Sequence, residues 1–409
     1  MQRIDHLNRN IIKLWISDTT SLFGTSIYQF ILVILAIDSN NSVFGAGLTL
    51  FFITAPYFFL GILGGTIADN FNRKNIMLFC DVFRAIIILI IPIYGLIFNE
   101  VSNILIIIVG FLVTSLRAFF YPAYQSLTPA LVTEIDELGK VNSMLNTTNG
   151  LSVILGPALG SLAFIFTENI YLLLFITSLT FIISAISIFN LKISKEKMSE
   201  TKSEKVNIIN ESIIGLKYVV FNNKLVLLML IAFTIQLLIG DGILSLALPK
   251  TIEDIGLSKG KFLGYCTSMI SIGSILTSIV MSNIKIQNNE KWIFIGYFLR
   301  GITYSLFVFS FSLGIIWVFF TCLLLGICFA ISGPTLTTLL QKNTDSNHIG
   351  KVMSLRSTLG NVTDSFSYII IGGMITMSTL NITYLLSTLL ILIITFLLYI
   401  FSVRKGVLQ

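Results

Sequence analysis

The feature that most constrains this chain is a series of long apolar runs separated by short polar segments. A helix needs about 20 consecutive apolar residues to cross the hydrocarbon core of a bilayer, and these runs have that length. Only 11% of the 409 residues are charged, whereas a soluble domain carries about 25%. A soluble fold of this composition would expose large apolar patches, so lipid is the predicted solvent.

The runs end at charged residues, Asn, Gly or Pro, and they fall into two groups of six. We predict an all-α polytopic membrane protein with twelve transmembrane helices in two pseudo-symmetric six-helix bundles, residues 1–191 and 225–409. A cytoplasmic linker, 192–224, joins them and is expected to be helical only from about Asn207 to Lys217. The predicted spans are 11–37, 43–68, 75–97, 102–125, 141–165, 169–191, 225–248, 261–283, 290–311, 314–340, 351–376 and 380–403.

The distribution of basic residues predicts the orientation of these spans. If the N-terminus is cytoplasmic, the inner segments hold 19 of the 26 Lys and Arg residues and the outer segments hold three. Such an excess predicts that both termini are cytoplasmic. The abundance of Ile, Asn and Lys favours a bacterial source, and hence the bacterial cytoplasmic (inner) membrane. Four arginines fall within the spans, and two of them, Arg300 and Arg356, are expected to extend toward the cytoplasmic surface.

The two groups of spans repeat each other at an offset of about 211–216 residues. The segment 139–144, Gly-Lys-Val-Asn-Ser-Met, reappears at 350–355 as Gly-Lys-Val-Met-Ser-Leu. The segment 81–85 in the third span has its counterpart at 297–301 in the ninth. Parallel six-helix repeats are typical of secondary transporters, which bind substrate between the two halves.

A loop motif connects the second and third spans. Gly65 and Asp69 are four residues apart, so they share one helix face, and a glycine there permits close approach of another helix. Asn72 lies where the chain reverses and can adopt a positive φ. Arg73 and Lys74 then hold the loop on the cytoplasmic side.

This stretch resembles the loop motif of the major facilitator superfamily, with matches at Gly65, Asp69, Arg73 and Lys74. Asn70 stands where the family usually has a basic residue, and Asn72 replaces the usual Gly. The resemblance is to the macrolide-efflux branch of drug:proton antiporters. It implies the major facilitator fold, and a conformational gate in which this loop latches the two halves.

A second motif lies in the fifth span, where Gly150 is followed by Gly156, Pro157 and Gly160. Gly156 and Gly160 form a small-residue face and Pro157 weakens the helix locally. The motif resembles the Gly-Pro-x-x-Gly pattern of antiporters in the same superfamily. That resemblance implies exchange of a substrate for protons.

Ionisable residues inside membrane spans are costly and therefore point to function. Asp18 lies in the first span, Arg117 in the fourth, Asp241 in the seventh and Asp364 in the eleventh. The resemblance implies that the first, fourth, seventh and tenth spans line the central path. The three carboxyl groups are candidates for proton coupling or substrate binding, and Arg117 is their candidate partner.

Asp81 and Arg84 are three residues apart in the third span and are expected to pair with each other in support of the cytoplasmic loop. Aromatic residues are abundant in the first four spans. Tyr28 and Tyr121 are the candidates for lining a substrate cavity, because a hydroxyl group seeks a partner that lipid does not offer.

The leading functional prediction is export of hydrophobic or amphipathic small molecules, of macrolide or multidrug type, by proton antiport with alternating access. The alternatives are a siderophore or lysophospholipid transporter of the same fold and an intramembrane enzyme. An enzyme would need a nucleophile–base pair or metal ligands in the spans, and His6 and His348 both lie at inner ends. No cofactor, metal or nucleic acid is expected, and the predicted partners of the monomer are substrate, protons and the lipid bilayer.

Overall fold

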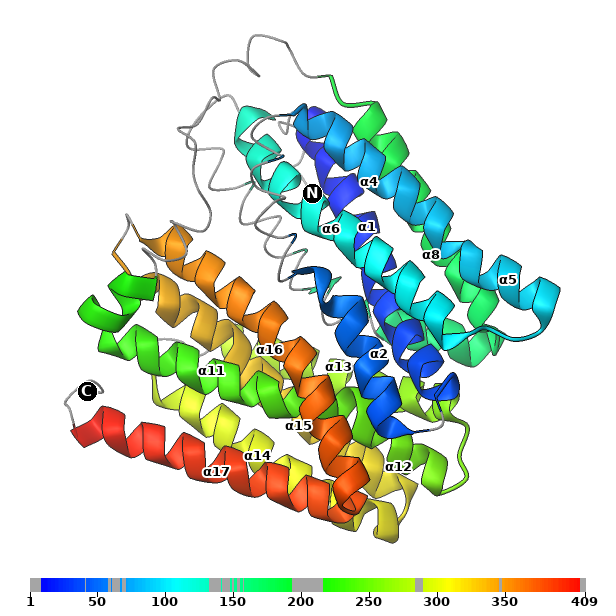
Figure 1. Ribbon diagram of the computed structural model, residues 1–409. Helices are drawn as coiled ribbons and strands as arrows, with labels where there is room; N and C mark the ends of the chain where they lie inside the picture. The colour runs from blue at the N-terminus through cyan, green and yellow to red at the C-terminus, as the bar shows by residue number, and fades with distance from the viewer. Residues whose placement is uncertain are drawn as a thin grey trace. The chain divides into compact units, whose positions relative to one another are not determined.

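The computed structural model describes the helices that carry most of the predicted spans (Figure 1). All regular structure in this part of the chain is helical, and nine of its helices are long and apolar enough to cross a membrane. The prediction of an all-α membrane protein is therefore confirmed. The described residues are 9–40, 42–57, 60, 67, 71–131, 141, 148, 151–152, 155–156, 158–192, 216–283, 290–345 and 348–404.

The chain forms two compact units. The first comprises Met1–Leu35 and Phe52–Ile208, and the second comprises Ala36–Phe51 and Ile209–Gln409. The predicted limits of the linker stay predictions, because residues 193–215 lie outside the described part. That gap also holds most of the predicted linker helix, and the described chain resumes in a helix at Leu216.

In the first unit, α4 packs between α6 and α8, and the hydroxyl of Ser17 in α1 is hydrogen-bonded to that of Ser184 in α8 (Figure 1). Ile11 and Leu14 of α1 meet Met77 of α4 in a buried core, together with Phe120 of α6 and Ile188 of α8. The helices are α1 (Arg9–Asp38), α4 (Arg73–Ile88), α5 (Ile90–Phe98), α6 (Asn103–Leu131) and α8 (Ile170–Phe189).

The third predicted span is divided into α4 and α5 by a break at Leu89. Pro92 explains the break, because it lacks the N–H that would bond to the Ile88 carbonyl and its ring crowds that carbonyl. The amide of Leu89 bonds instead to the carbonyls of Ile86 and Ile87. The two helices together are long and apolar enough to cross a membrane as one span of 26 residues, Arg73–Phe98.

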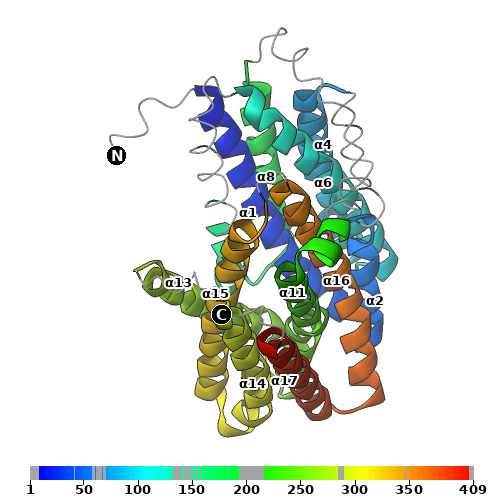
Figure 2. The ribbon, with the colours of Figure 1, turned by 90° about the vertical axis from the view of Figure 1, so that its left-hand side faces the viewer.

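The second unit contains the remaining helices (Figure 2). Its core joins Met229 of α11, Tyr297 of α14, Leu336 of α15 and Leu355 of α16. The helices are α11 (Lys224–Gly242), η1 (Ile243–Ala247), α12 (Leu248–Asp254), α13 (Lys259–Asn283), α14 (Lys291–Leu313), α15 (Ile315–Lys342), α16 (Ile349–Met377), α17 (Leu380–Arg404) and most of α2 (Val43–Thr54).

The seventh span carries a π-helical turn, η1, directly after Gly242, and then continues to Asp254. The sequence predicted an end near 248. Pro249 lies in the first turn of α12, directly after this wider turn. A proline is tolerated in the first turn of a helix, so the span continues past it. Single π-turns within helices occur frequently at functional sites, and this one follows Asp241.

Candidate functional site

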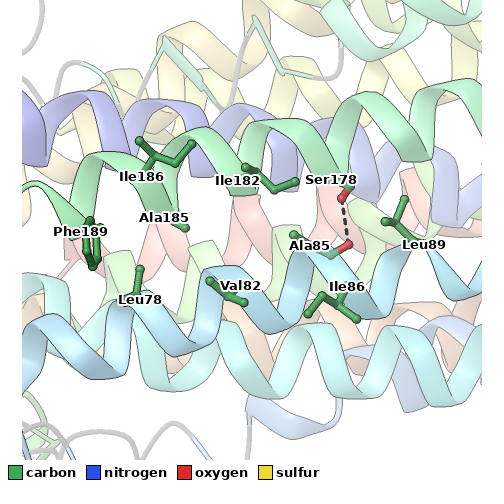
Figure 3. A pocket seen from close by; sticks show the side chains of 10 residues that line it. All are labelled: Leu78, Val82, Ala85, Ile86, Leu89, Ser178, Ile182, Ala185, Ile186 and Phe189. Carbon is green, nitrogen blue, oxygen red and sulfur yellow. Dashed lines mark hydrogen bonds between the residues drawn. The ribbon is translucent and has the colours of Figure 1, made fainter.

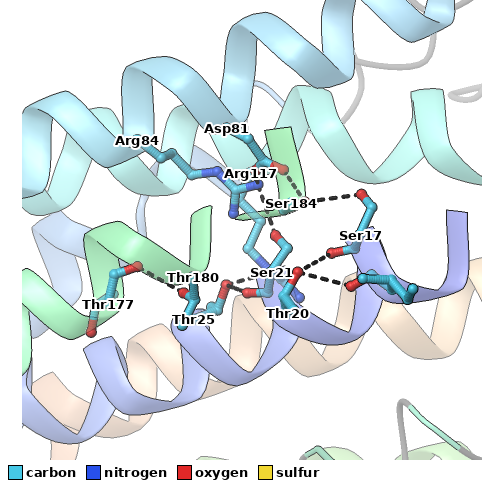
Figure 4. Close-up of polar contacts among 11 residues, drawn as sticks. Ser17, Thr20, Ser21, Thr25, Asp81, Arg84, Arg117, Thr177, Thr180 and Ser184 are labelled. Carbon is cyan, nitrogen blue, oxygen red and sulfur yellow. Dashed lines mark hydrogen bonds and ion pairs between the residues drawn. The ribbon is translucent and has the colours of Figure 1, made fainter. Parts of the chain in front are cut away.

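A buried ion pair, Asp81–Arg84, joins three helices of the first unit (Figure 4). Ser184 of α8 donates to Asp81 Oδ2 at 2.5 Å, and Ser17 of α1 donates to Ser184 at 2.9 Å. The Arg84 guanidinium also donates to the Ser21 hydroxyl at 3.1 Å. Both charged side chains are fully buried, so the predicted pairing exists and ties α1, α4 and α8 together.

Aromatic rings enclose the Arg84 guanidinium. Its centre lies 4.8 Å from the Phe120 ring and 4.4 Å from the Phe181 ring, within cation–π range. Its Nε and Nη1 atoms donate to no side chain or carbonyl of the described residues. Among the described residues, Asp81 is therefore the one carboxylate that compensates this charge. Without Asp81 the Arg84 guanidinium would be buried as an unpaired charge, which would destabilise the first unit.

Asp18 of α1 lies in the same unit and is only 3% exposed. Its carboxyl group is next to the Tyr124 hydroxyl and interacts electrostatically with Arg117, and Oδ2 accepts no hydrogen bond from the described chain. Arg117 donates to the Thr25 hydroxyl at 3.1 Å, so α6 and α1 are bridged (Figure 4). The structure thus brings Asp18 and Arg117 together but adds Tyr124, which the sequence did not single out.

The two tyrosines predicted to line a cavity differ. Tyr28 is 2% exposed and its hydroxyl has no hydrogen-bond partner among the described residues. Tyr121 is 40% exposed and belongs to the electrostatic surroundings of Asp18 and Arg117. Their role in binding substrate stays a prediction.

The loop motif is described at Ile67 and from Phe71 onward, and Gly65 and Asp69 lie outside the described residues. The expectation of a positive φ at Asn72 is wrong: its φ is −64°, and its side chain accepts from the Asn75 amide as the N-cap of α4. Arg73 donates to the Ser126 carbonyl at 2.9 Å. Lys74 donates to the carbonyls that end α8, so both basic residues make bonds inside the first unit.

The helix motif of the fifth span is described at Gly156 and Gly160, whereas Gly150 and Pro157 lie outside the description. Both described glycines face α1. A Cβ at Gly156 would lie 2.1 Å from the Ser26 Cβ, and one at Gly160 would lie 3.2 Å from the Ile27 Cα. Glycine at 156 is therefore what permits the close approach of this span to α1.

We expect Gly156→Ala to destabilise the protein, because the added methyl group overlaps Ser26 and the two helices must separate. Gly333→Ala in α15 is the matched control, since a Cβ there meets no atom within 4 Å and alanine favours helix. Thermal unfolding in detergent measures both. A Gly156→Ala protein as stable as the Gly333→Ala protein would contradict the packing described.

The second unit contains a carboxyl pair beside a buried arginine. Asp241 Oδ1 of α11 lies 3.8 Å from Arg300 Nη2 of α14, an ion pair longer than a hydrogen bond. The Asp364 carboxyl of α16 is within hydrogen-bonding reach of the Asp241 carboxyl. Its Oδ1 is buried and accepts no hydrogen bond from the described donors. Two carboxyl groups in contact cannot both be ionised at low cost, so this pair can hold a proton between them.

The residues around Asp241 create the space for this cluster. A Cβ at Gly240 would lie 2.1 Å from Arg300 Nη2 and 2.7 Å from the Tyr304 hydroxyl, so any larger residue would displace these two groups. Arg300 Nε donates to that hydroxyl at 2.7 Å. The Gly242 backbone amide donates to the Ser367 hydroxyl of α16 at 2.7 Å, which holds α16 beside the segment that carries Asp241.

The position predicted for the Arg300 side chain is wrong. It was expected to extend to the cytoplasmic surface, but it is 3% exposed and its guanidinium lies 4.3 Å from the Phe329 ring centre. The internal repeat could have indicated this burial, because it aligns Arg300 with Arg84. Both arginines are buried among aromatic rings, yet their carboxylates come from different places, Asp81 from the same helix and Asp241 from another.

Among the described residues, no group of three or more His, Cys, Asp or Glu side chains is arranged to hold a metal ion. The four cysteines are buried and none forms a disulfide.

Comparisons with known proteins agree with the fold. The chain is 24% identical over 340 residues to the uncharacterized MFS-type transporter YkuC of Bacillus subtilis, covering 78% of this chain and 75% of that one. It is 24% identical over 164 residues, 40% of each chain, to macrolide efflux protein A of Streptococcus pyogenes. The solved structure of the nucleoside transporter NupG superposes with a TM-score of 0.71 at 12% identity, covering 96% of this chain and 99% of that one.

The model of the Major Facilitator Superfamily matches residues 14–368, which include nearly all the predicted spans. The resemblance found in the loop motif is thereby confirmed at the level of the superfamily. The chain is a multi-pass membrane transporter that belongs to the Major Facilitator Superfamily.

Proposed function

We propose that the protein exports hydrophobic or amphipathic small molecules of macrolide or multidrug type by proton antiport with alternating access. The observation that carries the proposal is the Asp241–Asp364 carboxyl pair beside Arg300. Similarity to macrolide efflux protein A over 40% of the chain supports the substrate class. The proposal includes a monomer with both termini in the cytoplasm, as the basic residues indicate.

The carboxyl pair can couple the binding of substrate to the release of a proton. When it holds one proton, the pair carries a single negative charge, which Arg300 balances. Loss of the proton leaves two carboxylates for one guanidinium, and this costs free energy in a low-dielectric site. A cationic or polar group of the substrate can offset that charge, so substrate binding and proton binding oppose each other, as antiport requires.

Asp18 with Arg117 is the second candidate for proton handling. Asp18 is more deeply buried than Asp241, whose side chain is 26% exposed. Accessibility favours Asp241 as the residue that exchanges protons with water. Asp18 is assigned to the support of that cycle within its own unit, through Arg117 and Tyr124.

The proposal is tested by loading cells that express the protein with ethidium or a labelled macrolide and following retention. We expect expression-dependent efflux that collapses when a protonophore dissipates the proton gradient. Efflux that persists with the protonophore would refute proton coupling. Absence of efflux for every amphiphile tested would refute drug export, and siderophores and lysophospholipids would then be tested in the same cells.

A further inference from the structure

An apolar groove of about 530 Å³ runs between α4 and α8 on the surface of the first unit (Figure 3). Leu78 and Phe189 lie at one end, and Leu89 and Ser178 lie at the other. The Ser178 hydroxyl is occupied by a bond to the Ala85 carbonyl at 2.8 Å, so the lining offers only hydrocarbon to an occupant. In a membrane protein, such an exposed groove is filled by an acyl chain rather than by water.

Two lysines meet at the Phe189 end of this groove. Lys74 Nζ donates to the carbonyls of Phe189 at 2.8 Å and Leu191 at 2.7 Å. Lys13 Nζ donates to the Asn190 carbonyl at 2.7 Å. Because these three carbonyls are consecutive, the two ammonium groups lie close together. Lys74 is also 5.7 Å from the centre of the Phe189 ring, which itself lines the groove.

The positive charge at this end exceeds what the helix can neutralise. The carbonyls that end a helix carry about half a negative charge, whereas the two lysines carry two positive charges. No ion pair joins Lys13 or Lys74 to a carboxylate in the described chain. Lys13 retains two ammonium N–H groups and Lys74 retains one, so both can still donate to an anion.

We propose that this groove is a binding site for an anionic phospholipid, with one acyl chain between α4 and α8 and the phosphate on Lys13 and Lys74. The length agrees. Ser178 to Phe189 of α8 spans about 16 Å at 1.5 Å per residue, and one leaflet contributes about half of a 30 Å hydrocarbon core. Basic groups at the cytoplasmic end of a groove between helices are a recognised arrangement for anionic head groups. The site is independent of the transported substrate.

A tryptophan placed in the groove can report which lipid occupies it. The chain has three tryptophans, and all three are replaced by phenylalanine. Ile182→Trp then introduces the reporter, because Ile182 lines the groove, is 41% exposed and lies about 10 Å from Phe189 along α8. Leu389→Trp, 53% exposed on α17, is the matched control. Purified protein is reconstituted in vesicles of phosphatidylcholine containing increasing fractions of mid-chain-brominated phosphatidylglycerol or mid-chain-brominated phosphatidylcholine.

We expect brominated phosphatidylglycerol to quench the reporter at 182 with a preference of roughly fivefold or more, about what one lysine near an anionic surface contributes. The reporter at 389 should show no preference. Lys13→Gln with Lys74→Gln should abolish the preference at 182, since the amides still donate to the α8 carbonyls but carry no charge. Equal quenching by the two lipids at 182, an equal preference at 389, or a preference that survives the lysine substitutions would overturn the proposal.

Discussion

Asp241→Asn is expected to abolish proton-driven export while leaving the protein folded in the membrane. The amide keeps the size of the side chain, but it can neither release a proton nor share one with Asp364. Uphill efflux should fall to the level of cells without the protein. Downhill exchange of labelled for unlabelled substrate should persist in proteoliposomes, because that exchange moves no net protons. The comparison of uphill and exchange transport therefore separates coupling from folding.

Asp254→Asn provides the matched control for this substitution. Asp254 ends the same span, its side chain is 47% exposed, and it pairs with Lys250 at 2.9 Å. An exposed pair of this kind contributes little to stability, so export should stay near the wild-type rate. Equal losses in the two variants would show that carboxylates of this span act through general effects on charge, and would refute the special role of Asp241.

Asp81→Asn is expected to be the most destabilising of the conservative substitutions in the first unit. It leaves the Arg84 guanidinium buried between Phe120 and Phe181 without a compensating charge. Removing one member of a buried ion pair costs about 3–5 kcal/mol. The unfolding temperature in detergent should fall by many degrees, and a thiol-reactive dye can follow it because all four cysteines are buried in the folded protein.

Two variants show whether the lost charge is the cause. Glu100→Gln removes an exposed carboxylate of the same unit and should leave the unfolding temperature unchanged. Asp81→Leu combined with Arg84→Met removes both charges together and keeps an apolar filling, so it should recover much of the stability that Asp81→Asn loses. A double variant as unstable as Asp81→Asn would mean that shape or the hydrogen bonds of Ser184 and Ser21, rather than the unpaired charge, dominate.

The sequence was sufficient to predict the helices and the pairing of Asp81 with Arg84, but not the contacts between charged groups on different helices. Apolar runs locate spans because length and hydropathy are local properties, and the pairing of Asp81 with Arg84 follows from their spacing on one helix. The contact between Asp241 and Asp364 is different. Their helices are separated by more than 100 residues, so only packing brings the two carboxyl groups together.

The burial of Arg300 was also not predicted from the sequence. A lone arginine in an apolar run is compatible with a side chain that reaches the membrane surface, and the sequence around it names no partner. Its burial depends on Gly240, whose missing side chain makes room for the guanidinium, and on Tyr304 and Phe329 from its own and the neighbouring helix. The sequence shows the Gly-Asp-Gly segment 240–242, but it does not show that Gly240 leaves space for the Arg300 guanidinium.

The most direct test of the coupling mechanism is the release of protons by purified protein when substrate binds. A transported amphiphile is added to detergent-solubilised protein in weakly buffered solution near neutral pH, and a pH-sensitive dye measures the protons released. If Asp241 and Asp364 share a proton that substrate displaces, the wild type releases close to one proton per molecule. The Asp241→Asn variant then binds the amphiphile without release. Binding to the wild type without proton release, or equal release from the variant, would contradict the mechanism.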